Sequence, residues 1–304
     1  MTNFDRIFPL SLLYIVWLLI ASCSGGEIAP AMVATYLGDD GNEREMDVFV
    51  DSSYNHYFYS NYTNSPRPAI LYFHGGSWIS GSRAKIHQRY REPMLQRLVE
   101  KGFIVFSVDY RLVGLGRGHL EGVVSDCRAA LSYVVNNADA LGVDTLRIGL
   151  WGSSAGAHLA MMTAFADTLA ARRVKFLIDD FGPVDIHKMF SEVPEWGREL
   201  ISDIVFDIDG KSLAQFDSLT SVYSPINYNT NIPVLIFHGE DDNVVDISQS
   251  RMLHNKMLTN SKLVSFASNG HGLKNLDEKQ LKMYMETFEE FVEGGWSADV
   301  SSAK

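Results

Sequence analysis

Short apolar runs and amphipathic segments alternate along most of this chain. Compact apolar runs predict buried strands, whereas apolar positions spaced three to four residues apart predict helices. Alternation of the two favours an α/β fold with a mainly parallel sheet. The predicted strands are 31–37, 44–50, 68–73, 103–108, 146–151, 174–179, 233–237 and 262–266, the first two as an antiparallel pair. The predicted helices are 88–100, 120–136, 155–165 and 275–294.

A serine between glycines directly follows the predicted strand 146–151. The run from Gly152 to Gly156 reads Gly-Ser-Ser-Ala-Gly and leads into a predicted helix. A strand, a tight turn and a helix are typical of the G-x-S-x-G nucleophile elbow, whose turn strains the serine backbone and exposes its hydroxyl. We therefore expect Ser154 to be a nucleophile. The alternative is an ordinary strand-to-helix loop with a helix-capping serine.

A second glycine-rich loop follows the predicted strand 68–73. It reads His-Gly-Gly-Ser-Trp from His74 to Trp78. Glycines let backbone N–H groups approach a ligand closely, and two such groups can hold a developing oxyanion. We expect the N–H groups of Gly75, Gly76 and Ala155 to do so, and His74 to brace the loop. The alternative is a plain turn.

Candidates for an acid and a base follow the serine, in the order that a nucleophile elbow requires. Glu240, Asp241 and Asp242 crowd the end of the strand 233–237, and His271 lies between two glycines after the strand 262–266. His158, one helical turn after Ser154, is expected to be a satisfied core histidine. The histidines in polar contexts, expected to face solvent, are His56, His87, His119, His187 and His254.

Together these motifs resemble those of α/β-hydrolase esterases, in the group that includes hormone-sensitive-lipase-like and BD-FAE (feruloyl-esterase-like) enzymes. The matching stretches, in the family's order from about residue 68 to 272, are LYFHGGSW, VFSVDYRL, the run from Asp126 through GVDTLRIGLWGSSAGAHLA, DFGPVD, SPINY, PVLIFHGEDDNVV and NGHG. The resemblance implies an α/β-hydrolase fold with an eight-stranded, mainly parallel sheet, with Asp242 as the acid and His271 as the base. Two departures, Ser77 and Ala157 in place of common glycines, could reshape the acyl pocket.

Composition limits the alternatives. The 304 residues suit one α/β domain with a short lid, expected at about 185–230. With 26 basic and 37 acidic residues, the net charge of −11 argues against nucleic acid as a partner. No metal-ligand cluster or C-x-x-C motif is present in the sequence, so we expect neither a metal nor a cofactor. Asp126 and Arg111 are expected to form a structural ion pair.

The N-terminus resembles a bacterial lipoprotein signal. Residues 8–21 are apolar but too short to span a bilayer comfortably, and small residues precede Cys23. The resemblance to a lipobox implies a signal peptide over 1–22, a mature domain over 23–304, and an exported protein anchored to a membrane by lipid on Cys23. The alternatives are an uncleaved anchor helix and an ordinary secretory signal.

The motifs and the family resemblance predict a serine ester hydrolase acting on short acyl esters, such as acetyl or feruloyl groups on a carbohydrate. Two other functions fit the same residues. The His74–Trp78 motif also matches the H-G-G-x-W of arylformamidase-like amide hydrolases, and a catalytically silent surface lipoprotein could bind glycan through the cleft. The aromatic residues that would either stack on substrate or pack the lid are Trp78, Phe190, Trp196 and Phe206.

Overall fold

One eight-stranded sheet forms the centre of the protein. The computed structural model describes residues 27–51, 65–114, 119–166, 168–191, 193–206 and 213–294. The strand order is β1-β2-β4-β3-β5-β6-β7-β8; β2 is antiparallel to both of its neighbours, and all other neighbouring pairs are parallel. The predicted sheet is therefore confirmed. Its strands are β1 (Met32–Leu37), β2 (Glu43–Phe49), β3 (Arg67–Phe73), β4 (Ile104–Val108), β5 (Val143–Ser153), β6 (Val174–Asp180), β7 (Val234–Gly239) and β8 (Ser261–Phe266).

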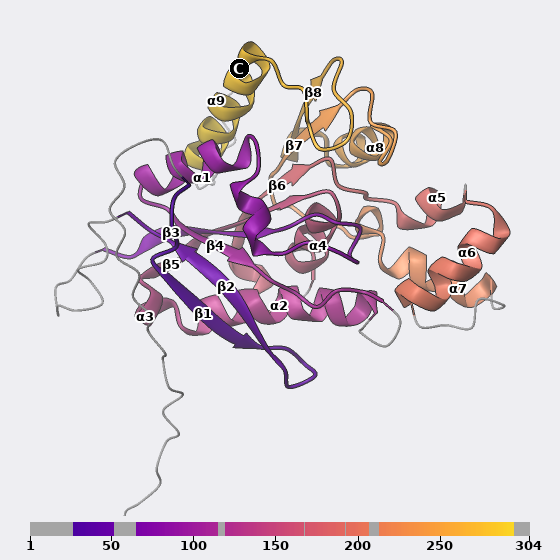
Figure 1. The fold of residues 1–304 in the computed structure, drawn as a ribbon, viewed down its shortest axis with the longest axis horizontal. Helices are drawn as coiled ribbons and strands as arrows, with labels where there is room; N and C mark the ends of the chain where they lie inside the picture. Colours follow the sequence, from indigo (N-terminus) through magenta and orange to yellow (C-terminus); the bar gives the residue numbers. More distant parts are fainter. Residues whose placement is uncertain are drawn as a thin grey trace, which may run out of the picture.

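Helices cover both faces of this sheet. In Figure 1, α1 and α9 lie on one side of it and α2 on the other. Alternate residues of β3 pack into different layers: Ile70 and Tyr72 join the core under α1 and α9, whereas Leu71 and Phe73 join the core under α2 and α4. Burial on both faces explains the nearly continuous apolar runs of the central strands. The layer helices and nearby short turns are η2 (Arg83–His87), α1 (Arg91–Glu100), α2 (Leu120–Asn136), α3 (Ala138–Leu141), α4 (Ala155–Ala164), η3 (Ala171–Arg173), α8 (Ser248–Met257), η6 (Leu258–Asn260) and α9 (Glu278–Gly294).

Two helices begin later than the apolar pattern predicted. Helix α1 begins at Arg91 rather than at residue 88, and Pro93 lies in its first turn, where the missing N–H breaks no helical hydrogen bond. Helix α9 begins at Glu278 rather than at residue 275, because Asp277 Oδ1 accepts the N–H of Gln280 at 2.7 Å. A local cap sets the start of α9, whereas no side-chain cap marks the start of α1.

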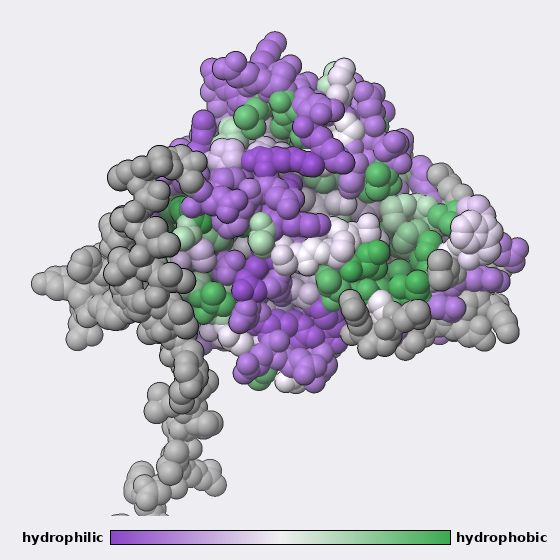
Figure 2. All heavy atoms as spheres, viewed as in Figure 1, coloured by the Kyte–Doolittle hydropathy of each residue, from purple (hydrophilic) through white to green (hydrophobic). Residues whose placement is uncertain are grey.

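The described residues between β6 and β7, where the lid was expected, are mainly helical. Figure 1 shows α5–α7 apart from both helical layers. Their aromatic side chains pack on one another, with ring centroids 6.4 Å apart for Phe190 and Phe206 and 5.8 Å apart for Phe206 and Phe216. Figure 2 shows apolar surface gathered beside these helices. The segments are α5 (Ile186–Ser191), α6 (Glu195–Ile201), η4 (Ser202–Phe206), α7 (Leu213–Val222) and η5 (Pro225–Asn227).

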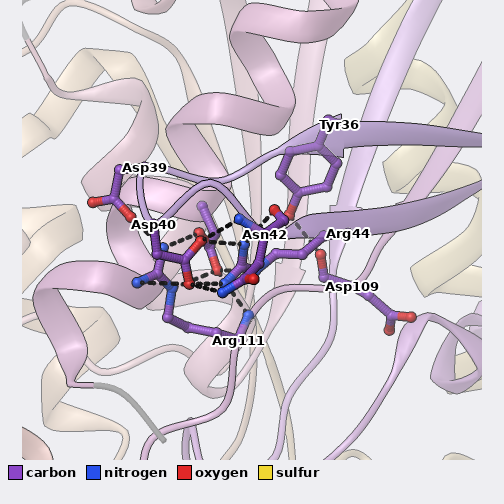
Figure 3. Close-up of polar contacts among 8 residues, drawn as sticks. Tyr36, Asp39, Asp40, Asn42, Arg44, Asp109 and Arg111 are labelled. Atoms are coloured by element: carbon purple, nitrogen blue, oxygen red, sulfur yellow. Dashed lines mark hydrogen bonds and ion pairs between the residues drawn. The ribbon is translucent and has the colours of Figure 1, made fainter. Parts of the chain in front are cut away.

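A buried ion-pair network ties the β1–β2 hairpin to α2. Asp126 is fully buried; its Oδ1 lies 2.6 Å from Arg111 Nη2 and its Oδ2 lies 2.5 Å from Arg44 Nε. Asp40 also pairs with Arg44, and Asp39 with Arg111 (Figure 3). The expected Asp126–Arg111 pair is therefore confirmed. Carboxylate oxygens of all three aspartates lie within 4.8 Å of one another, and the guanidinium groups of Arg44 and Arg111 balance two of the three negative charges.

The N-terminal expectations lie outside the described residues. Residues 1–26, which contain the predicted signal peptide and Cys23, precede the first described range. Across the ranges that the structure does describe, no helix is both long enough and apolar enough to cross a bilayer. Cys127 is buried in α2 as a free thiol.

Candidate active site

Ser154 occupies a strained turn between β5 and α4. Its φ of 56° and ψ of −122° lie outside the ordinary regions for a residue with a side chain. The flanking glycines make the turn possible, because a Cβ on Gly156 would lie 2.0 Å from the carbonyl oxygen of Phe73, and one on Gly152 would lie 2.3 Å from that of Gly156. The N–H of Ser154 donates to the carbonyl of Asp180 at 2.8 Å. The predicted nucleophile elbow is present.

Three side chains from different loops form a continuous hydrogen-bond chain. Ser154 Oγ lies 2.9 Å from His271 Nε2, and His271 Nδ1 lies 2.8 Å from Asp242 Oδ2. Ser154 follows β5, Asp242 follows β7 and His271 follows β8, all at the carboxyl edge of the parallel strands. The structure therefore brings together the predicted nucleophile, acid and base, which lie about ninety and thirty residues apart in the sequence, in the geometry of a serine-hydrolase triad.

Hydrogen bonds hold the Asp242 carboxylate ionised. Burial alone would favour the protonated acid, but hydrogen bonds from His238, His271 and the N–H groups of Val245 and Val244 hold the pKa of Asp242 well below its usual range. Both N–H groups donate to Oδ1 at 2.9 Å. A permanently charged acceptor keeps the proton of His271 on Nδ1 and leaves Nε2 free to accept from Ser154.

His238 is a buried contact of this carboxylate that the sequence reasoning did not single out. Its Nε2 lies 2.8 Å from the carbonyl oxygen of Val245 and 3.4 Å from Asp242 Oδ2, and its Nδ1 lies 2.6 Å from Ser250 Oγ. The available signal was its place at the end of an apolar strand, four residues before the acid. His238 thereby holds the loop after β7 in place through Val245, and contacts the Asp242 carboxylate that this loop carries.

The glycine-rich loop after β3 lies against the elbow. A Cβ on Gly75 would lie 2.6 Å from the carbonyl oxygen of Ser153 and 3.3 Å from Ser154 Cβ. Within the described ranges, no protein group accepts a hydrogen bond from the N–H groups of Gly75, Gly76 or Ala155. These three predicted oxyanion donors are therefore beside the nucleophile and free to bind an oxygen atom.

His74 packs in the interior behind this loop. Its ring stacks on Tyr110 with centroids 4.2 Å apart, and its Nδ1 lies 3.1 Å from the Tyr110 hydroxyl and 3.0 Å from the carbonyl oxygen of Gly75. Burial lowers the pKa of His74 to about 4, so the ring is neutral near pH 7. This geometry agrees with the bracing role expected for His74.

His158 joins the glycine-rich loop to the helical insertion. Trp78 Nε1 donates to His158 Nδ1 at 3.2 Å, and His158 Nε2 donates to the carbonyl of Tyr223 at 2.7 Å. Burial lowers the pKa of His158 to about 4. With both nitrogens bonded, His158 is the satisfied core histidine that we expected.

Burial and ring contacts decide whether the aromatic residues stack on substrate or pack the lid. Trp78 is 5% exposed and lies 6.5 Å, centroid to centroid, from Phe190, which is buried with Phe206. Packing rather than substrate stacking therefore accounts for these three side chains, because all three are buried. The indole N–H of Trp78 finds the partner it needs in the interior, at His158 Nδ1. Trp196 differs, since 71% of it is exposed.

The expectation that the remaining histidines face solvent is confirmed for His187 and is wrong for the other three that the structure describes. His87, His119 and His254 are half-buried, His187 is exposed, and His56 lies outside the described residues. Polar groups contact two of the half-buried rings: His87 Nδ1 lies 2.5 Å from Glu92 Oε2, and His254 Nδ1 lies 2.9 Å from Ser261 Oγ. None of the four joins the Ser154 site.

A cleft of about 290 Å³ opens beside Ser154 and His271. Gly75 and Gly76 form part of its wall, and four basic side chains that sequence reasoning missed also line it: Lys85, Arg89, Arg91 and Lys274. A separate hollow of about 380 Å³ near the amino ends of β3 and β5 contains none of the expected site residues. The cleft is therefore the candidate active site.

Comparison with known proteins gives one family match and several relatives. The family model described as BD-FAE matches residues 56–257. Isoprenylcysteine alpha-carbonyl methylesterase ICME of Arabidopsis thaliana is 26% identical over 198 residues, which cover 61% of this chain and 45% of that protein. Esterase LipC of Mycobacterium tuberculosis is 27% identical over 230 residues, covering 70% and 54%. The chain thus spans about half the length of these curated relatives.

The fold matches that of a solved esterase. The esterase Est2 of Thermogutta terrifontis has a TM-score of 0.67 and 23% identity, with 91% of this chain and 96% of that chain covered. Structures of the same esterase contain bound propionate or butyrate, or are phosphonylated by cyclosarin. The similarity confirms the α/β-hydrolase fold predicted from the sequence.

Proposed function

The chain belongs to the BD-FAE family, and from this premise we propose that it is a serine hydrolase of carboxylic esters. The observation that carries the proposal is the chain of contacts from Ser154 Oγ through His271 to Asp242, at 2.9 and 2.8 Å. Hydrolysis of a chromogenic acetate such as p-nitrophenyl acetate tests it.

The geometry supports a two-step reaction. Ser154 Oγ attacks the acyl carbon while His271 Nε2 takes its proton, and the N–H groups of Gly75, Gly76 and Ala155 bind the resulting oxyanion. Collapse of this intermediate expels the alcohol, which receives the proton from His271. A water molecule then attacks the acyl-enzyme with His271 as base, and release of the acid restores Ser154.

Asp242 orients and stabilises the base. Its carboxylate accepts the Nδ1–H of His271 and so fixes the tautomer whose Nε2 faces Ser154. When Nε2 takes up the serine proton, the positive charge on the imidazole lies next to the negative charge of Asp242. No step in this mechanism requires a metal or a cofactor.

For substrates, we favour short acyl esters, acetyl or feruloyl, on a carbohydrate. A cleft of about 290 Å³ suits a small acyl group better than a long chain. The propionate and butyrate in the Thermogutta terrifontis structures are also short acids. We would compare kcat/KM for acetylated xylo-oligosaccharide, methyl ferulate and a long-chain p-nitrophenyl ester; preference for the long chain would overturn this assignment without affecting the triad.

The His-Gly-Gly-Ser-Trp motif from His74 to Trp78 supports one alternative chemistry, amide hydrolysis of the arylformamidase type. The same nucleophile and oxyanion donors would cleave an aromatic formamide, so relative kcat/KM on phenyl acetate and formanilide separates the two reactions. If neither is hydrolysed, the non-catalytic alternative, a glycan-binding surface lipoprotein, becomes the better account.

We also propose that the mature protein begins at Cys23 and is held by lipid at a bacterial membrane, as an exported lipoprotein. The lipobox-like residues before Cys23 support this location. Two acyl chains are enough for stable attachment. Such an enzyme would meet esters outside the cytoplasm, where acylated polysaccharides occur.

A further inference from the structure

The cleft beside Ser154 is cationic, although the chain as a whole has a net charge of −11. Lys85, Arg89, Arg91 and Lys274 line it, and no carboxylate does. Within the described part of the chain, none of these four cations forms an ion pair. Arg83, close by in sequence, pairs instead with three carboxylates, from Glu45, Asp47 and Asp109.

Arg91 is a buried cation with unused donors. It is only 5% exposed. Its guanidinium donates through Nε to the carbonyl of Lys85 at 3.0 Å and through Nη1 to the Tyr90 hydroxyl at 3.2 Å, with a longer contact of 3.5 Å from Nη2 to Gln88 Oε1. A guanidinium carries five N–H donors, so two are left. The nearby carboxylate of Asp180 is linked to Arg91 only through the Tyr90 hydroxyl. Burying a charge is costly, and an anion in direct contact with the guanidinium would offset part of that cost.

Tyr72 adds a neutral donor at the same place. Its side chain is fully buried but lines the cleft, and its hydroxyl has no partner in hydrogen-bonding geometry among the described residues. Burial raises the pKa of Tyr72, so the hydroxyl keeps its proton at neutral pH. A guanidinium beside an O–H donor is a suitable environment for a carboxylate.

Two of the cations are attached to the loops that carry the proposed chemistry. Lys85 Nζ donates to the carbonyl of Gly75 at 2.9 Å, and Arg89 Nη1 donates to the carbonyl of Gly272 at 3.3 Å. An anion held by these groups would therefore lie close to the scissile ester. Figure 2 shows hydrophilic surface between α1 and the strands β7 and β8.

Two buried carboxylates near the cleft do not cancel this charge. Asp242 is bonded to His271, and Asp180 accepts hydrogen bonds from Trp151, Ser153 and Tyr90. Even with both ionised, the four cations outnumber them. We infer that the cleft selects esters that carry a carboxylate close to the scissile bond, an inference that rests on the proposed ester hydrolysis. On a carbohydrate, a uronic acid supplies such a group.

Matched pairs of esters test this selectivity. One pair places the carboxylate on the alcohol side, 3-acetoxybenzoate against its methyl ester; the other places it on the acyl side, the 4-nitrophenyl monoester of glutaric acid against 4-nitrophenyl pentanoate. In at least one pair, kcat/KM should be about tenfold higher for the carboxylate at low ionic strength, and the ratio should fall as salt is added.

The failures of the two proposals are distinguishable. If neutral esters are hydrolysed but neither carboxylate is preferred, the inference is overturned and the ester hydrolase remains. If no ester in either pair is hydrolysed, the proposed function itself fails.

Variants locate the selectivity in the cleft. Because Arg91 is buried and its replacement could unfold the protein, the primary variant is the double change Arg89→Gln and Lys274→Gln at the exposed rim. It should lower the carboxylate-to-neutral ratio about fivefold. The control is Lys282→Gln, whose side chain is 71% exposed on α9 and should leave the ratio unchanged. A ratio in the folded double variant equal to that of the wild type would contradict the inference.

Discussion

Asp242 Oδ2 and His271 Nδ1 lie 2.8 Å apart, although their residues belong to loops after different strands. Strands β7 and β8 pair in parallel, so both loops leave the sheet at the same edge. Of the three carboxylates after β7, only Asp242 reaches the histidine; Glu240 Oε1 instead accepts from Ser265 Oγ at 2.7 Å. Two features therefore set the position of Asp242. They are the register of β7 with β8 and the hydrogen bonds that Asp242 Oδ1 accepts from the N–H groups of Val244 and Val245.

Asp242→Asn should lower kcat by up to about 10⁴, because the amide favours the wrong tautomer of His271. Asp241→Asn is the matched control, since Asp241 is an exposed neighbour in the same loop. Steady-state kinetics on a short-chain ester measure both. Greater damage from Asp241→Asn would mean that the acid has been assigned one residue too late.

Trp78→Phe should destabilise the protein by about 1–2 kcal/mol, because His158 Nδ1 would lose its donor in the interior. The phenyl ring keeps much of the packing against Phe190. Chemical unfolding measures the loss. Phe190→Leu is a useful control, since it alters packing without removing a hydrogen bond; an unfolding free energy of Trp78→Phe equal to that of the wild type would contradict the role given to this contact.

Asp179 should make stability depend on pH. Its Oδ1 accepts the N–H of Gly182 at 2.7 Å, its Oδ2 is buried without a partner, and burial raises its pKa to about 8. The native state therefore binds the proton more tightly than the unfolded state, whose pKa is about 3.9. The stability that this proton gives is complete below pH about 4 and is lost as the pH rises to about 8.

Asp179→Asn keeps an acceptor for Gly182 but does not titrate. The unfolding free energy of the wild type should consequently fall relative to this variant by about 1.4 kcal/mol per pH unit within that window. Urea unfolding of both proteins at several pH values gives the difference. A difference that stays constant from pH 4 to pH 8 would show that Asp179 is not protonated in the native state.

The sequence was sufficient for the sheet and for the candidate triad. Central strands such as 68–73 are apolar throughout because both faces are buried, and the glycines around Ser154 mark a turn that leaves no room for side chains. The base follows from its place after a further strand, whereas the choice of Asp242 among the three carboxylates after residues 233–237 came from the family resemblance. Motifs of this kind are local in sequence. A parallel sheet brings them together because the carboxyl ends of its strands lie at one edge.

The cationic lining could not be found in the same way. Arg91 begins an amphipathic helix, where a basic residue suggests solvent, and Lys274 lies far along the chain in the loop after His271. Only the packing of η2 and α1 against the loop after β8 places Lys85, Arg89, Arg91 and Lys274 around one cleft. Hydrophobic periodicity does not predict which side chains from separate polar segments come together in the folded protein.

Cys23→Ala should prevent lipid attachment and leave either an uncleaved precursor or a soluble form. The reason is that the thiol is the only group in the lipobox-like segment that can take a thioether-linked diacylglycerol. Mass spectrometry of the N-terminal peptide from membrane-extracted protein is the measurement. Recovery of an unmodified peptide that contains Cys23 would rule out lipidation, with Cys127→Ala as the control for nonspecific thiol effects.

The identity of the nucleophile is the central claim, and covalent labelling with a fluorophosphonate followed by peptide mapping tests it most directly. Ser154 lies 2.9 Å from His271 Nε2, whereas Ser153 Oγ donates to Asp180 at 3.1 Å. We predict a single label on Ser154, its complete loss in Ser154→Ala, and its retention in Ser153→Ala. A label on Ser153, or no label on a preparation that hydrolyses esters, would contradict the account.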